Sequence, residues 1–120
     1  MPSRDVAGDV DHFTGVLGAQ LVFAIERFGT RVAMVKLTEE PPAVLLAEHL
    51  EGERPVLIFR VASLERALSE VESHGFEAGE RFDIPHGPAC SLDAPGGQRL
   101  AIYELTRPAV AARIAGRRDF

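Results

Sequence analysis

The residues with the clearest chemical potential lie in the last third of the chain, between His86 and Glu104. Leu100, Ile102 and Glu104 alternate along one face of a predicted strand, so a carboxylate ends an otherwise apolar row. Burying such a group is costly unless it meets water, a ligand or a metal. Glu104 is therefore a candidate for a carboxylate that orients a ligand. The alternative is a structural acid paired with an arginine or a backbone amide.

Two further polar residues are candidates for contact with a ligand. His86 stands in a Pro-His-Gly-Pro segment that leads into a predicted hairpin. Histidine is the side chain best suited to acid–base chemistry near neutral pH, and the alternative for His86 is an ordinary loop residue. Glu48 shares a predicted strand face with Leu46. It is either a metal ligand beside Glu104 or a solvated residue at the end of a strand.

Composition narrows the class of protein. The 120 residues fit one domain, and the net charge of −5 comes without a basic stripe, which argues against nucleic-acid binding. A single cysteine, Cys90, rules out an internal disulfide and favours a reducing, cytoplasmic location. The polar N-terminus does not resemble a signal peptide, and no apolar run has the length of a membrane helix. The sequence therefore indicates a cytoplasmic protein with no membrane partner.

Hydrophobic periodicity predicts alternating helices and strands. Asp5 and Ser63 are natural N-caps of two helices that end before Gly18 and Gly75. A third, short helix is predicted over residues 109–115, ahead of a charged tail. Strands are predicted over residues 20–28, 30–38, 43–50, 56–61, 80–84, 89–92 and 98–105.

These elements form an internal repeat in which Asp5 corresponds to Ser63, an offset of 58 residues. Each half is a helix followed by about three strands, and residues 56–61 supply a strand ahead of the second helix. Only residues 1–4 are available ahead of the first helix, so that strand is missing or stunted. We predict an α+β fold with two βαβββ modules of mixed sheet. Residues 1–120 form one domain, with module one at about 1–54, module two at about 55–107, and a tail at 108–120.

The order of these motifs resembles the vicinal oxygen chelate superfamily, which includes glyoxalase I, extradiol dioxygenases and bleomycin-resistance proteins. The resemblance is carried by residues 5–18, 59–75 and 93–104, the last containing the turn DAPGG before the strand that ends in Glu104. It implies paired modules whose curved sheets enclose a central cavity, often completed by dimerisation. In the metal-dependent members, four positions on cavity-facing strands supply the metal ligands.

The resemblance also implies which of those four positions retain a ligand here. The last matches Glu104, whereas two others fall on Val56 and near Leu46, whose side chains cannot bind a metal. The first belongs to the opening strand, where only residues 1–4 are present. Because a divalent ion typically needs three or more protein ligands, we expect no metal and no other cofactor.

The function favoured by the sequence is binding of a small organic molecule in an apolar cavity, without catalytic residues. The alternatives are a metal-dependent lyase, isomerase or dioxygenase with displaced ligands such as Glu48, His86 and Glu104, and a structural or regulatory protein whose cavity has closed. A homodimer is expected because a missing opening strand leaves a sheet edge exposed. The predicted ligand-binding residues are Leu46, Glu48, Val56, Ile58, His86, Ile102 and Glu104.

Overall fold

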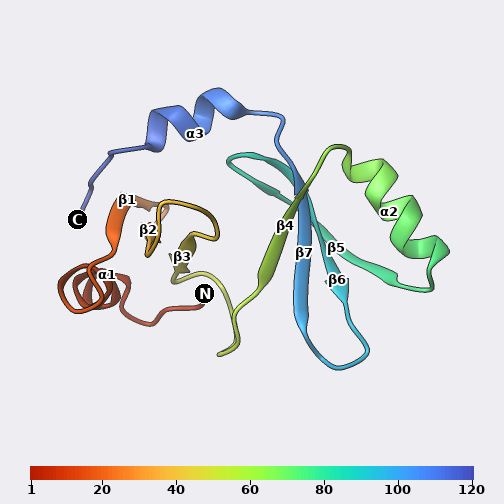
Figure 1. Cartoon of the computed structure of the whole chain (residues 1–120), viewed down its shortest axis with the longest axis horizontal. Helices are drawn as coiled ribbons and strands as arrows, with labels where there is room; N and C mark the ends of the chain where they lie inside the picture. Colours follow the sequence, from red (N-terminus) through yellow and green to blue (C-terminus); the bar gives the residue numbers. More distant parts are fainter. The chain divides into compact units, whose positions relative to one another are not determined.

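The computed structural model describes all 120 residues and divides into two compact units. The first unit comprises residues 1–54 and 113–120, and the second comprises residues 55–112. In each unit a helix lies along one side of a sheet (Figure 1). The predicted α+β class with two repeated modules is confirmed, and every predicted helix and strand is present. No helix has both the length and the apolar character needed to cross a membrane.

The first unit packs helix α1 (Val6–Gly15) against a three-stranded antiparallel sheet. The strands, in spatial order, are β1 (Gln20–Arg27), β2 (Thr30–Lys36) and β3 (Val44–Ala47). Asp5 caps the helix as predicted, because its side chain accepts a hydrogen bond from the Gly8 amide at 3.0 Å. The core forms where Val6 and Val10 of α1 meet Ala24, Ala33 and Leu46 on the sheet.

The predicted stunted strand at the start of the chain is confirmed. Pro2 forms a single parallel bridge with Ala47 of β3. The Ser3 amide donates to the Ala47 carbonyl at 3.1 Å, and the Ala47 amide donates to the Met1 carbonyl at 3.0 Å. This single bridge joins the start of the first unit to its last strand in parallel. In the second unit, the first and last strands form a full parallel pair.

The second unit packs α2 (Leu64–Ser73) on a four-stranded mixed sheet. The strands, in spatial order, are β4 (Leu57–Val61), β7 (Arg99–Glu104), β6 (Gly87–Asp93) and β5 (Glu77–Ile84). Only the β4–β7 pair is parallel. Ser63 caps α2 as predicted, through a 3.3 Å hydrogen bond from the Arg66 amide. Leu64 and Leu68 of α2 pack on Cys90, Leu92 and Ile102.

Several strands differ in length from the prediction, and for two of them, β5 and β3, the local reason is visible. Strand β5 starts at Glu77 rather than at residue 80, because a bulge near Gly79 lets the ladder continue. There the Glu80 amide donates to the Ser91 hydroxyl at 2.8 Å instead of to a backbone carbonyl. Strand β3 ends at Ala47 because the next residue, Glu48, turns its carboxylate onto the Arg31 amide at 2.8 Å.

The end of the chain is more ordered than the charged tail that the sequence suggested. After α3 (Pro108–Ile114), residues 116–119 run along the outer edge of β1. Gly116 and Asp119 donate backbone hydrogen bonds to β1, and the Ala24 amide donates to the Arg117 carbonyl at 2.8 Å. Phe120 then packs against the core of the first unit, with the Arg31 guanidinium 5.0 Å from its ring centroid.

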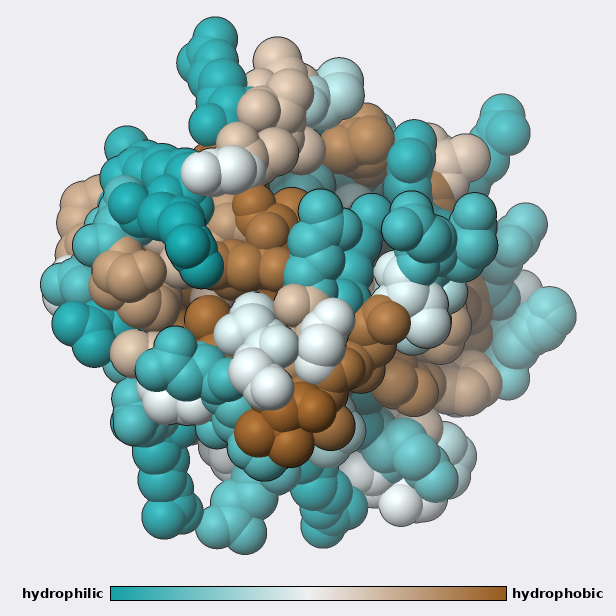
Figure 2. Space-filling view, turned by 60° about the vertical axis from the view of Figure 1, so that its left-hand side comes forward, coloured by the Kyte–Doolittle hydropathy of each residue, from teal (hydrophilic) through white to brown (hydrophobic).

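Apolar side chains also reach the surface, where they lie among hydrophilic ones (Figure 2). Phe28, at the β1–β2 turn, is fully exposed. Leu57, Ile58 and Phe59 of β4 are all exposed. This short strand lies at the edge of its sheet. Because successive strand residues point to opposite faces, apolar side chains are exposed on both faces of this edge strand. Such exposure is unusual and makes the second unit the first place to look for a site.

Candidate functional site

One face of the four-stranded sheet in the second unit is covered by α2, as Figure 1 shows. Cys90, Leu92 and Ile102 point to this covered face, and Arg81 reaches from it to pair with Glu65 of α2 at 2.5 Å. Because side chains alternate along a strand, the residues between these point to the opposite, helix-free face. We define the helix-free face by these residues of β4, β7, β6 and β5: Ile58, Arg60, Ala101, Tyr103, Ala89, Ser91 and Phe82.

The helix-free face combines a small-residue floor with larger side chains around it. Ala89 and Ala101 are buried, whereas Phe82 remains 39% exposed and Ile58 44% exposed. Arg60, Tyr103, Ala89 and Phe82 are register partners in one row across the sheet. The row therefore puts an arginine and a tyrosine at neighbouring positions on adjacent strands, with a phenylalanine beyond a single alanine.

His86 joins this row from the β5–β6 turn. Its ring contacts Tyr103 edge to face, with the two centroids 6.0 Å apart. Its carbonyl accepts hydrogen bonds from the amides of Thr106 and Arg107, at 3.0 and 2.9 Å, which fixes the turn. The next residue must be Gly87, because its φ is +153° and a Cβ there would lie 2.1 Å from the Glu104 carbonyl oxygen.

Burial lowers the pKa of His86 below its ordinary value of 6.5, so the ring is neutral at pH 7. At pH values between the folded and the unfolded pKa of His86, the unfolded chain binds more protons than the folded chain does. The free energy of unfolding therefore rises with pH in that window. We expect the free energy of unfolding to fall as the pH drops from 7 through 6.5. Urea titrations of His86→Gln should show a flatter pH dependence than those of the wild type. Equal slopes in the two proteins would contradict this prediction.

The predicted site residues of the second unit divide between the two faces. Ile58 lies on the helix-free face, the half-buried Val56 immediately precedes β4, and His86 contacts that face through Tyr103. Ile102 belongs to the core under α2. Glu104 also lies on the covered face, where its Oε1 accepts a 2.8 Å hydrogen bond from the amide of Leu64, the first residue of α2. Glu104 thus has a backbone amide as its partner.

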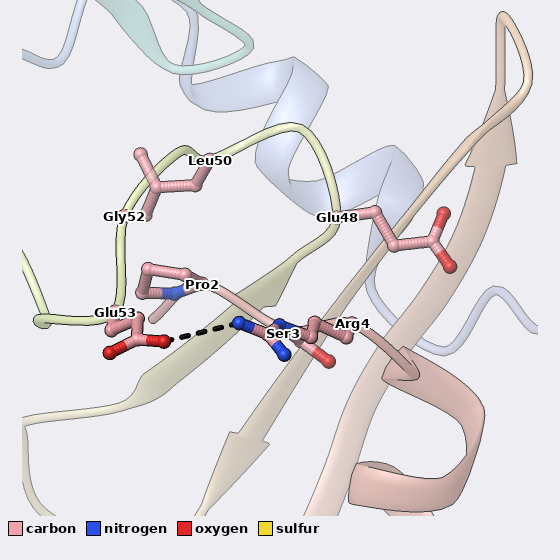
Figure 3. Close-up of a pocket in the computed structure, with 7 residues that line it drawn as sticks. All are labelled: Pro2, Ser3, Arg4, Glu48, Leu50, Gly52 and Glu53. Atoms are coloured by element: carbon pink, nitrogen blue, oxygen red, sulfur yellow. Dashed lines mark hydrogen bonds and ion pairs between the residues drawn. The ribbon is translucent and has the colours of Figure 1, made fainter.

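The two predicted residues of the first unit also have different surroundings. Leu46 is buried in the core beneath α1. Glu48 lies beside a hollow of about 480 Å³ that Pro2, Leu50 and Gly52 also line. Figure 3 shows the Glu48 carboxylate pointing away from the exposed Arg4–Glu53 ion pair, whose atoms are 3.1 Å apart. We assign the hollow no function.

The residues present do not fit a metal centre of the kind that the resembled superfamily uses. No three His, Cys, Asp or Glu side chains of the chain lie close enough together to hold an ion. Within the second unit, His86 and Glu104 therefore belong to no such group. On the helix-free face, β7 presents Ala101 and Tyr103, neither of which is a carboxylate.

Sequence reasoning missed Arg60 and Tyr103 as members of a candidate site. Strand alternation gave both rows of β7 correctly, but the row ending in Glu104 was taken as the cavity side. The available signal was the size of the residues. Leu100 and Ile102 carry the larger apolar side chains of β7, which a covering helix requires, whereas the other row contains the small Ala101.

Comparison with known proteins identifies the fold. No family model matches the sequence, and no curated protein matches it. A hypothetical protein, BH1468 from Bacillus halodurans C-125, superposes with a TM-score of 0.68 at 19% identity, covering 86% of this chain and 88% of that one. Methylmalonyl-CoA epimerase from Mycobacterium tuberculosis gives 0.66 at 17% identity, covering 92% and 86%. The chain has the vicinal oxygen chelate fold.

Proposed function

We propose that this protein binds a small organic molecule, without a metal ion, on the helix-free face of the second unit. The observation that carries the proposal is the row of Arg60, Tyr103, Ala89 and Phe82, joined by His86. Ligand sites are concave and mostly apolar, with a few placed polar groups, and the residues of this row have that composition. Ile58 extends its apolar part along β4.

The proposal relocates the site that the sequence suggested. Val56, Ile58 and His86 stay in it, whereas Leu46, Ile102 and Glu104 are engaged in packing or in holding a helix. Binding by shape and a few polar contacts needs no ion. The metal-dependent lyase, isomerase or dioxygenase would need a ligand set that the residues do not form.

The experiment is a set of melting curves with a library of small organic compounds, on wild type, Tyr103→Ala and Phe28→Ala. Compounds that bind should raise the wild-type melting temperature, because a ligand that binds only the folded state stabilises it. Tyr103→Ala should lose most of the shift. Phe28→Ala should keep it, since that ring is fully exposed in the other unit. Zinc, nickel or manganese should leave all three curves unchanged. Stabilisation by a metal alone, with no response to any compound, would overturn the proposal.

We also propose that the protein forms a homodimer. The structure changes the reason for expecting this, because residues 116–119 cover the edge of β1 and Pro2 bridges to β3. The edge strands that remain are β4 and β5 of the four-stranded sheet, and β4 carries three consecutive exposed apolar residues. Light scattering should give about twice the chain mass of 13.0 kDa at high micromolar concentration. Ile58→Lys, which places a charge on that strand, should give the mass of one chain. A single-chain mass for the wild type at that concentration would end the proposal.

A further inference from the structure

We propose that the ligand of the helix-free face is a planar aromatic anion, whose charged group binds Arg60 and whose ring packs against Tyr103. This inference rests on the proposed function and narrows it to one class of ligand. It depends on three features of the row: the availability of the guanidinium, the absence of competing acids nearby, and the aromatic side chains beside it.

The Arg60 guanidinium is available for a ligand. The five ion pairs of the structure engage Arg4, Arg31, Arg81, Arg107 and Arg117. Arg60 is exposed and takes part in no hydrogen bond, ion pair or ring contact. An unpaired guanidinium offers a rigid fork of N–H donors that matches carboxylate or phosphate geometry.

The row that contains Arg60 includes no carboxylate. Arg60 and Tyr103 are register partners, and the residues that continue their row are Ala89 and Phe82. The nearest acid on the helix-free side of β6 is Asp93, four residues from Ala89 along the strand. At roughly 3.3 Å per residue this is about 13 Å, beyond the Debye length of physiological salt. In a chain of net charge −5, the row is thus a local place where an anion is attracted.

The groups beside Arg60 are aromatic. Tyr103 is half-buried and braced by the edge-to-face contact with His86, and Phe82 stands across the single residue Ala89. Two rings held by strands offer a large contact area for a flat molecule at little cost in side-chain entropy. Because burial keeps His86 uncharged at pH 7, Arg60 is the cation of the row. An aromatic carboxylate satisfies both the charge and the rings.

The test uses three probes that separate charge from aromaticity: 1-naphthoate, its uncharged amide 1-naphthamide, and cyclohexanecarboxylate. Binding is followed by calorimetry and by chemical shifts of the protein. Naphthoate should bind about 10- to 100-fold more tightly than naphthamide, which is the range for one charge-assisted hydrogen-bonded contact. Cyclohexanecarboxylate should bind more weakly than naphthoate, because it cannot stack.

Variants assign those differences to residues. Arg60→Gln should remove the preference for naphthoate over naphthamide, whereas Arg60→Lys should keep part of it, because lysine retains the charge without the fork. Arg66→Gln is the matched control, since it removes an exposed arginine of α2 from the covered side of the same unit. It should leave all three affinities unchanged. Tyr103→Ala should weaken naphthoate and naphthamide alike.

The outcomes distinguish this inference from the proposed function. Equal affinity for naphthoate and naphthamide, or an unaltered preference in Arg60→Gln, would overturn the anion inference and leave small-molecule binding standing. The same holds if naphthoate fails to bind while uncharged compounds from the library bind in a way that depends on Tyr103. If no compound binds at all, the proposed function fails together with the inference.

Discussion

Deleting residues 116–120 should lower the free energy of unfolding by about 3 kcal/mol, the largest effect that we expect from any small change. The deletion removes three backbone hydrogen bonds to β1 and the hydrogen bond from the Glu26 amide to Asp119, 2.9 Å long. It also removes Phe120 from the core of the first unit. The freed entropy of five residues offsets part of this loss. For a chain of this size the melting temperature should drop by roughly 10 °C.

The deletion should also change how the protein associates. Without residues 116–119, β1 presents a row of unpaired amides and carbonyls, which can pair with another chain. Light scattering of the truncated protein should therefore show concentration-dependent association beyond that of the wild type. Phe120→Ala isolates the packing contribution, because it leaves the backbone pairing in place. Phe28→Ala, at a fully exposed ring, is the control and should melt as the wild type does. An unchanged melting temperature after deletion would show that the segment does not stabilise the first unit.

The sequence alone predicted the elements well because the signals for them are local. A capping side chain such as Asp5 or Ser63 acts on an amide three residues away, and both caps are present in the structure. The stunted opening strand followed from the repeat and from the shortness of residues 1–4. The DAPGG turn also forms, with the Gly97 amide donating to the Ala94 carbonyl at 3.0 Å.

The face on which a residue lies depends on distant partners and was harder to predict. Alternation places Ile102 and Tyr103 on opposite sides of β7, but it does not tell which side a helix covers. A shift of the strand register by one residue would move every side chain of β7 to the opposite face of the sheet. The core decides this, since Ile102 packs with Leu64 and Leu68 of α2, and Tyr103 is left for the other face. The pairing of residues 116–119 with β1 was missed for a similar reason, because its partners lie about 90 residues earlier in the chain.

The second large effect that we expect concerns Glu104, whose carboxylate holds the start of α2. Its Oε1 accepts the Leu64 amide at 2.8 Å, and Leu64 is buried, so water cannot easily replace the acid. A carboxylate at a helix N-terminus is also favoured by the helix dipole. Glu104→Ala leaves that amide unpaired and should cost about 2 kcal/mol, or roughly 5–10 °C in melting temperature.

Glu104→Gln keeps an accepting oxygen and loses only the charge, so it should cost about half as much as Glu104→Ala. Glu72→Ala, at an exposed acid of the same helix, should stay within about 0.5 kcal/mol of the wild type. Because Glu104 lies on the covered face, both of its variants should bind naphthoate with the wild-type affinity at a temperature where they remain folded. If Glu104→Ala instead melts like the wild type and loses naphthoate binding, the acid belongs to the ligand site and the assignment of the two faces is wrong.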